Sequence, residues 1–436
     1  MSQQLTNDYV KEADTTRVMH SWSIQGKLNP FVIKSGLGAK VWDHEGNEYL
    51  DFSSQLVNTN VGHQHPRLIK AIQEQAAELA TVAPAHANIT RARAAEAILS
   101  VAPAGFKKVF FTNAGADAIE NAFRMARIFT GKDKILSQYR SYHGNTSGAI
   151  QATGERRRFK NEYAHGFVHF FGPHPYRSDF WSTNEEEECE RALQHLRRVI
   201  ECEDPNAIAA IVLEALPGSA GVIVPPQGYF EGIRQLCDEF GIMLIMDEVM
   251  VGFGRTGKWF AHQHADVKAD LITIAKGVNS GYVPVGGVIV SEAISDYFDD
   301  QMFPGGLTYS GHPLAMASVV ENIAILKDEK LIENAERLGR EVLEPGLKAL
   351  AEKHEIVGNV RGRGLFWAIE LVSDRQTKAA PSADAMNQVK NALLAKGLLP
   401  FMADNRIHVA PPLVVTEDEV KQALAIYDAV LSETSF

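Results

Sequence analysis

The chain reads IMLIMD at residues 242–247 and LITIAKG at residues 271–277. Both are short apolar runs that lead into a charged residue, Asp247 in the first and Lys276 in the second. Apolar runs of this length are typical of strands that are buried on both faces of a parallel sheet. We therefore expect Asp247 and Lys276 at the carboxyl ends of two neighbouring strands.

The same pattern continues on either side of these two runs. Four further apolar runs alternate with amphipathic helical segments: VFFT at 109–112, KILSQY at 134–139, IAAIVLE at 208–214 and GGVIV at 286–290. Alternation of buried strands with helices favours an α/β fold around a parallel sheet.

The domain organisation follows from changes of pattern, because no repeat or Pro/Ser/Gly-rich linker divides the chain. Residues 31–53 contain short strand-like segments around a turn, and after Pro313 the chain is mostly helical until strand-like segments near 364–372 and 406–415. We predict an N-terminal segment (1–65) that packs with the small domain, a large domain (66–312) and a small C-terminal domain (313–436).

The composition excludes several classes of protein. The 436 residues carry 43 Lys and Arg against 54 Asp and Glu, and the net charge of −11 disfavours nucleic acid or an anionic membrane as the main partner. The three cysteines are odd in number and lack CxxC spacing, so they indicate neither a disulfide framework nor a thiolate zinc site. A polar N-terminus without an apolar run of bilayer length predicts a soluble, cytoplasmic protein.

Asp247 and Lys276 are the first candidates for chemistry, because ligands of open α/β sheets bind at the carboxyl ends of strands. Either residue alone is compatible with a solvated strand end. Together, a carboxylate and an amine at two strand ends match the needs of pyridoxal phosphate. The amine forms a Schiff base with the cofactor, and the carboxylate keeps the pyridine nitrogen protonated.

Two further segments suit the same cofactor. The segment Asn113–Ala118 follows a predicted strand and opens a helix that ends at Gly131, so its free N–H groups can hold a phosphate. A turn requirement is the other explanation for Gly115. Tyr142, after the strand at 134–139, can stack on a flat ring or belong to the core.

The chain resembles the class III aminotransferases, which are pyridoxal-phosphate enzymes of fold type I. The matching segments are FTNAGADA (111–118), YHG (142–144), IMDEVMVGFGRTGKWFA (245–261), ITIAKG (272–277) and GGLTYSGHP (305–313). These segments follow one another in the same order as in the family. The part of the chain that resembles the family extends from about Gly36 to Val415. The resemblance implies a large domain with a mostly parallel seven-stranded sheet and a smaller α+β domain.

The resemblance also implies roles for individual residues. Lys276 would bond the cofactor and act as catalytic base, and Asp247 would lie beside the ring nitrogen. The other implied cofactor contacts are Gly115 and Ala116 at the phosphate, Tyr142 and Val249 on the two faces of the ring, and His143 and Glu214 nearby. Thr308 would reach the phosphate of the neighbouring subunit's cofactor, so a homodimer is implied, with a tetramer left open.

The substrate pocket departs from some branches of the family. The ornithine and 4-aminobutyrate branches carry a gating glutamate at the position of Ser219, and both Ala114 and Ala116 lack the hydroxyl that is common there. Arg406, in the segment NRIHVAPP (405–412), is our candidate for the carboxylate clamp, and a surface strand arginine is the alternative. Val57 and Trp22 are further expected substrate contacts.

Other clusters are assigned no chemistry. The histidine pairs His63/His65 and His262/His264 lack a partner set, so no metal site is predicted. Glu185–Glu188 fits the start of a solvated helix. We interpret Arg156–Arg158 as surface or subunit-contact charge.

The sequence thus predicts a pyridoxal-phosphate-dependent ω-aminotransferase. It would move an amino group from a terminal amine or ω-amino acid to a keto acid, with pyruvate as the expected acceptor. β-Alanine, taurine, 4-aminobutyrate and chiral amines all remain as donors. The alternative is an amino-acid racemase or decarboxylase on the same scaffold, and a binding protein without turnover is the third possibility.

Overall fold

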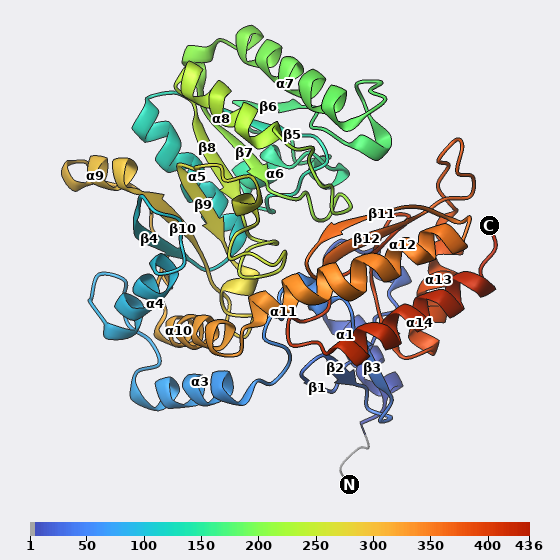
Figure 1. Ribbon diagram of the computed structural model, residues 1–436. Coiled ribbons are helices and arrows are strands. Elements are labelled where there is room, and N and C mark those ends of the chain that lie inside the picture. Colours follow the sequence, from blue (N-terminus) through green and yellow to red (C-terminus); the bar gives the residue numbers. More distant parts are fainter. Residues whose placement is uncertain (1–4) are drawn as a thin grey trace.

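The computed structural model describes residues 5–436, which are organised around three sheets (Figure 1). The largest sheet has seven strands in the order β4-β10-β9-β8-β7-β5-β6. Its strands are β4 (Phe106–Thr112), β5 (Lys134–Gln138), β6 (Phe167–Phe170), β7 (Ile208–Glu214), β8 (Met243–Asp247), β9 (Leu271–Ile274) and β10 (Gly286–Ser291). Strands β5 to β9 pair in parallel, whereas β10 is antiparallel to both β9 and β4. The predicted α/β fold with a mostly parallel seven-stranded sheet is confirmed.

Alternate residues of these strands enter two different apolar clusters. In β7, Ile211 and Leu213 belong to one cluster, whereas Ala210 and Val212 belong to the other. This follows from the period of two along a strand, and it requires helices on both faces. The helices of the second cluster are α5 (Gly115–Thr130), α6 (Ser147–Ala152) and α9 (Glu292–Asp300). Those of the first include α4 (Ile89–Leu99), α7 (Glu185–Cys202), α8 (Tyr229–Phe240) and α10 (Pro313–Asp328), and α3 (Pro66–Glu78) packs beside α10.

Two features of this sheet differ from the sequence expectations. Strand β6 was not predicted, because its sequence FVHF is short, contains a histidine and is only partly buried at the edge beside β5. The reversed direction of β10 leaves no sign in the apolar run GGVIV, since burial on both faces looks alike in either direction. The predicted helix that ends at Gly131 is α5, and Gly131 closes it with a φ of 67°.

The C-terminal part contains a four-stranded antiparallel sheet. Its order is β11 (Val357–Arg363), β12 (Phe366–Leu371), β15 (Arg406–Val409) and β14 (Phe401–Ala403). The helices of this part are α11 (Leu331–Leu338), α12 (Glu344–Lys353), α13 (Ala383–Ala395) and α14 (Glu417–Glu433), drawn in orange and red in Figure 1. Strand β11 lies in a stretch that was expected to be helical. Its sequence VGNVRGR has few apolar residues, and pairing with β12 makes it a strand.

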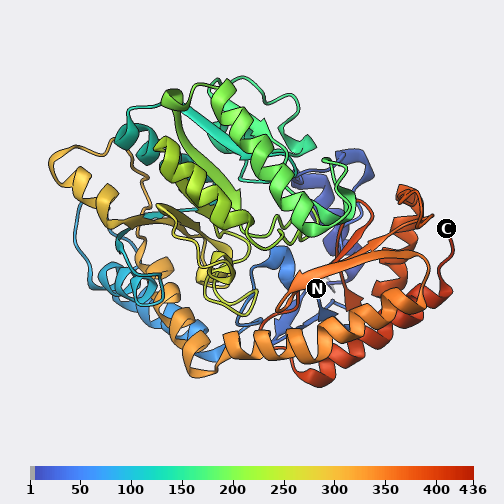
Figure 2. The same ribbon diagram turned by 45° about the horizontal axis from the view of Figure 1, so that its top comes forward.

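The N-terminal strands join the C-terminal part of the chain. The third sheet consists of β1 (Ser35–Leu37), β2 (Lys40–Trp42), β3 (Glu48–Asp51) and β13 (Leu398–Leu399), with β13 parallel to β3. Figures 1 and 2 show the blue N-terminal strands beside the red C-terminal helices. The remaining helices of this region are α1 (Asn7–Arg17) and α2 (Ser54–Val57). The limits at residues 65 and 312 stay predictions.

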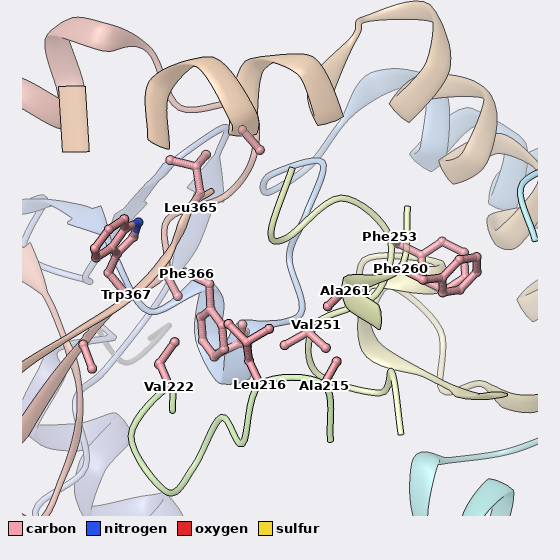
Figure 3. Close-up of a cluster of buried hydrophobic side chains, with 14 of the residues drawn as sticks. Ala215, Leu216, Val222, Val251, Phe253, Phe260, Ala261, Leu365, Phe366 and Trp367 are labelled. Atoms are coloured by element: carbon pink, nitrogen blue, oxygen red, sulfur yellow. The ribbon is translucent and has the colours of Figure 1, made fainter. Parts of the chain in front are cut away.

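Loops that follow the large sheet pack against the C-terminal sheet. Figure 3 shows Leu216, after β7, and Val251, after β8, close to Phe366 of β12. All three are buried in one cluster. Within residues 5–436, no helix is both long enough and apolar enough to cross a membrane.

A fully buried arginine ties these parts together. Arg255, in the loop after β8, donates from Nη1 to the carbonyl oxygens of Leu365 and Pro411, and from Nη2 to Asn60 Oδ1 at 2.9 Å. Burial lowers the pKa of its guanidinium to about 9, so it still carries a charge at pH 7. One side chain therefore links the large sheet, the C-terminal part and the N-terminal segment.

We expect Arg255→Met to lower the free energy of unfolding by roughly 2–4 kcal/mol, because buried acceptors lose a charged donor. Denaturant unfolding measures this change, with Arg340→Met on the exposed surface as the control. Equal stabilities of the two variants would contradict the structural role of Arg255.

Candidate active site

Three strand ends bring ionisable side chains together in one cavity. Glu214 ends β7, Asp247 ends β8, and the two residues are partners in the pairing of these strands. Lys276 lies two residues beyond β9, in the 3₁₀ turn Lys276–Val278. A cavity of about 230 Å³ is lined by all three residues and by Tyr142 and His143. The predicted meeting of Asp247 with Lys276 at the strand ends is therefore found in the structure.

Asp247 is held by contacts on both carboxylate oxygens. Its Oδ1 accepts from the backbone N–H of Val249 at 3.0 Å and from Thr273 Oγ1 at 3.2 Å, and its Oδ2 lies 2.7 Å from His143 Nδ1. Burial opposes a charge on His143, but the hydrogen bond and charge of Asp247 outweigh it and raise the pKa of the imidazole. The carboxylate therefore has a fixed orientation and a partner that supports its negative charge.

Glu214 and Lys276 titrate far from their ordinary ranges. Burial raises the pKa of Glu214 to about 7, assisted by the charge of Asp247, although N–H donors from Gly218 and Tyr142 oppose the shift. Burial also lowers the pKa of Lys276 to about 8, against the nearby carboxylates of Glu214 and Asp247. Lys276 has a φ of 46°, a strained conformation that is common at functional sites. Such values suit an amine that must lose and regain a proton near neutral pH.

The start of α5 forms the opposite wall of the cavity. The helix begins at Gly115, and its N-cap residue, Ala114, makes no side-chain capping hydrogen bond. A Cβ atom at Gly115 would lie only 2.9 Å from Val249 Cγ1, so close packing requires glycine here. Free N–H groups at the start of a long helix bind anions such as phosphate. The cavity thus offers a carboxylate, an amine and an anion site, and these residues fit pyridoxal phosphate.

Tyr142 and Val249 both line the cavity, as expected for the two faces of a ring. The ring of Tyr142 also carries an unexpected neighbour. The guanidinium carbon of Arg157 lies 3.6 Å from its centroid, and Trp22 meets it edge-on at 6.3 Å. The charge of Arg157 is one of the influences that lower the pKa of Lys276.

The interpretation of Arg156–Arg158 as surface or subunit-contact charge does not anticipate where Arg157 lies. The three residues form a 3₁₀ turn, which points consecutive side chains in different directions. Arg156 is 78% exposed and pairs with Asp404, whereas Arg157 is 27% exposed and reaches the Tyr142 ring. A run of three arginines carries no sequence signal that separates the middle one from its neighbours. Only the turn geometry identifies it.

A second cavity of about 780 Å³ adjoins the first, and Ser219 lines both. Trp22 and Arg406 also line the second cavity, and Arg406 Nη2 lies 2.8 Å from Asp404 Oδ2. Val57 is fully buried in the apolar core and lies outside both linings. Thr308 is exposed between β10 and α10, also outside both linings. The structure of the single chain thus brings Trp22 and Arg406 toward the site, but not Val57 or Thr308.

Each of the four histidines in the two histidine pairs has a hydrogen-bond partner within the protein. His63 pairs with Asp51, His65 with Glu329, His262 with Glu248, and His264 with the backbone oxygen of Thr256. Within residues 5–436, no group of three or more His, Cys, Asp or Glu side chains is arranged to hold a metal ion.

Comparison with known proteins identifies relatives of nearly full length. The sequence pattern of the Aminotransferase class-III family matches residues 23–431. Taurine–pyruvate aminotransferase of Bilophila wadsworthia is 34% identical over 437 residues, which cover 95% of each chain. Alanine/serine racemase of Pyrococcus horikoshii is 33% identical, over 95% of this chain and 88% of the racemase.

A solved structure is similar throughout. Taurine:2-oxoglutarate aminotransferase from Bifidobacterium kashiwanohense, in complex with PLP and glutamate, superimposes with a TM-score of 0.95. It is 42% identical, and the match covers 99% of this chain and 98% of that one. At this similarity the arrangement of strands and loops around the cavity is that of a pyridoxal-phosphate enzyme.

The lowered pKa of Lys276 predicts its reactivity in the cofactor-free protein. An amine reacts with an aldehyde only when deprotonated, so reductive methylation of Lys276 should rise with pH and reach half its maximum near pH 8. Mass spectrometry of peptides measures the rate at each lysine, and the solvent-exposed Lys70 is the internal reference. A half-point above pH 10, near the ordinary lysine value, would contradict the effect of burial.

Proposed function

We propose a substrate class for this chain, which belongs to the class-III aminotransferases and is a pyridoxal-phosphate-dependent aminotransferase. Its donor is an ω-amino acid, a compound with a terminal amine at one end and a carboxylate or sulfonate at the other. Its acceptor is an α-keto acid. Taurine, β-alanine and 4-aminobutyrate belong to this donor class, whereas simple chiral amines do not.

The position of Arg157 carries this proposal. Its guanidinium lies over the ring of Tyr142 at the edge of the cavity that Lys276 lines, with the indole of Trp22 5.7 Å away. A guanidinium binds a carboxylate or sulfonate by two parallel hydrogen bonds, and stacking on an aromatic ring does not use its N–H groups. A donor without an acid group would make no use of this cation. The two taurine aminotransferases described above are named for a donor of this kind.

Asp247 and Lys276 have different roles in the proposed reaction. When bound, pyridoxal phosphate supplies a ring that accepts electrons from the bond broken at the substrate carbon. Asp247 would keep a proton on the ring nitrogen of the cofactor, and the hydrogen bonds that it accepts from Thr273 and Val249 fix the direction of its carboxylate. Lys276 would hold the cofactor through its amine, and the same amine is the base that would take up and return the proton at the substrate carbon.

Other residues position the cofactor. The N–H groups of Gly115 and Ala116 would hold its phosphate, and Tyr142 and Val249, which line the same cavity, would contact its ring. His143 supports the charge of Asp247, and Glu214 holds the backbone of Tyr142 through a 2.8 Å hydrogen bond.

A homodimer completes the site in this proposal. Thr308 is exposed and outside the cavities of its own chain. Its hydroxyl can therefore serve the phosphate at the site of a second copy.

The acceptor is pyruvate, the keto acid predicted from the sequence and named in the taurine–pyruvate relative. 2-Oxoglutarate is a second candidate, because Arg157 and Arg406 line the same cavity and can bind two carboxylates at once. The relative that is 42% identical uses 2-oxoglutarate.

A donor panel with the holoenzyme tests the proposed function. Taurine and β-alanine should be used well and 1-propylamine poorly, with alanine formed from pyruvate or glutamate from 2-oxoglutarate. Arg157→Met should reduce kcat/KM for the acid-bearing donors by roughly 10- to 100-fold and leave propylamine unchanged, since one charged contact is worth about 1.5–3 kcal/mol. Arg156→Met, in the exposed neighbour, is the matched control.

Equal losses with all donors would contradict the role of Arg157. Racemised alanine or serine without a keto product would replace the aminotransferase with the racemase alternative. A deaminated product with any acid-bearing donor supports the proposal.

Arg406 is tested through the acceptor. We expect Arg406→Ala to raise KM for pyruvate and to leave the half-reaction with propylamine intact, because only the keto acid needs that cation. Stopped-flow spectra of each half-reaction separate the two effects. An unchanged KM for pyruvate would assign its carboxylate to another arginine.

A further inference from the structure

The cation over Tyr142 has a counter-ion that the sequence did not indicate. Glu155 Oε2 accepts hydrogen bonds from Arg157 Nε at 2.9 Å and from Nη2 at 2.5 Å. Glu155 Oε1 accepts a hydrogen bond from Ser219 Oγ. All three residues line the second cavity, and Ser219 also lines the first. The carboxylate of Glu155 is therefore anchored where the two cavities meet.

We propose that Glu155 is the gating carboxylate of this site: it pairs with Arg157 while no acid group is bound and releases it to the acid group of a substrate. This inference rests on the proposed function, since it needs an acid-bearing donor. The resemblance places a gating glutamate at position 219 in other branches. Here Ser219 holds the carboxylate of residue 155 at that place instead.

The anchoring of Ser219 makes its hydroxyl a fixed point. The preceding Gly218 donates its N–H to Glu214 Oε2 at 2.9 Å, which ties this loop to the end of β7. A Cβ atom at Gly218 would lie 2.1 Å from Met250 Sδ, so the loop packs closely against the segment after β8. Ser219 therefore keeps its place when the ion pair opens.

The geometry assigns the movement to Glu155 rather than to the arginine. Arg157 lies on the Tyr142 ring at 3.6 Å, and this contact stays when the carboxylate leaves. Among residues 5–436, the carboxylate of Glu155 is hydrogen-bonded to Ser219 and Arg157, and its side chain is 21% exposed. A partly exposed ion pair is weak, so a substrate carboxylate or sulfonate can replace it at little cost.

The exchange preserves the charge balance of the catalytic cavity. The charge of Arg157 acts on Lys276 and that of Glu155 acts on His143. When a substrate anion replaces the carboxylate beside Arg157, the guanidinium remains neutralised. When a substrate without an acid group binds, the Glu155–Arg157 pair stays closed and serves the same purpose. Glu155 thereby keeps the guanidinium of Arg157 neutralised whether or not an acid group is bound.

Glu155→Gln in the holoenzyme tests the gate, because it keeps the shape of the side chain and removes the competing charge. The probe is ethanesulfonate, which carries an acid group and no amine, and its dissociation constant is measured by calorimetry. We expect Glu155→Gln to bind ethanesulfonate about fivefold more tightly and to lower KM for taurine by a similar factor. Ser219→Ala should change affinity in the same direction by less.

Two further variants serve as controls for Glu155→Gln. Glu162→Gln removes the neighbouring carboxylate that pairs with Arg158 on the same loop and should leave every value unchanged. Glu155→Asp keeps the charge, and we expect its affinity for ethanesulfonate to stay within twofold of that of the unmodified enzyme.

The possible results distinguish a failure of the Glu155 gate from a failure of the proposed donor class. Loss of ethanesulfonate binding in Arg157→Met with no change in Glu155→Gln overturns the gate alone. Weaker binding in Glu155→Gln also overturns it, because Glu155 would then position Arg157 rather than compete for it. Unchanged ethanesulfonate binding in Arg157→Met overturns the proposed donor class.

Discussion

The burial of the Lys276 amine is the constraint on which the site depends. A charged ammonium out of water costs several kcal/mol unless opposite charges lie close by. Here Glu214 and Asp247 end the two neighbouring strands, and burial still lowers the pKa of Lys276 to about 8. The amine of Lys276 can therefore gain or lose a proton near neutral pH. Parallel strands bring Glu214, Asp247 and Lys276 together because the carboxyl ends of such strands lie at one edge of the sheet.

The parts of the fold that follow from burial could be predicted from the sequence. The apolar runs identify six strands of the large sheet, and the charged residues after two of them identify Asp247 and Lys276. Strand β6 could not be identified, since pairing at an edge gives FVHF its structure. Strand β11 was missed for the same reason, because pairing with β12 and not its own side chains makes it a strand. Sequence patterns thus predict strands that are buried on both faces, but they do not predict strands that form because they pair with a neighbouring strand.

The same contrast explains which site residues were found. Asp247 and Lys276 lie at the ends of regular elements, where position along the chain fixes position in space. Arg157 and Glu155 lie in and beside a short 3₁₀ turn, where neighbouring residues point in different directions. Their contacts with Tyr142 and Ser219 join segments distant in the sequence. Without the fold, a row of arginines on an acidic protein is most simply explained as surface charge.

Chemistry and specificity therefore rest on different parts of the molecule. The proton-moving groups are fixed by a sheet whose strands are buried on both faces, so their geometry changes little. The groups that we propose to select a substrate lie on the loop with Glu155 and Arg157, near Trp22, and at the start of β15 with Arg406. Such segments accept substitutions at small cost to stability, because they bury little apolar surface. The proposed gate uses this division, because Glu155 on a loop would supply the carboxylate beside Ser219 while the strand ends near Lys276 and Asp247 keep their geometry.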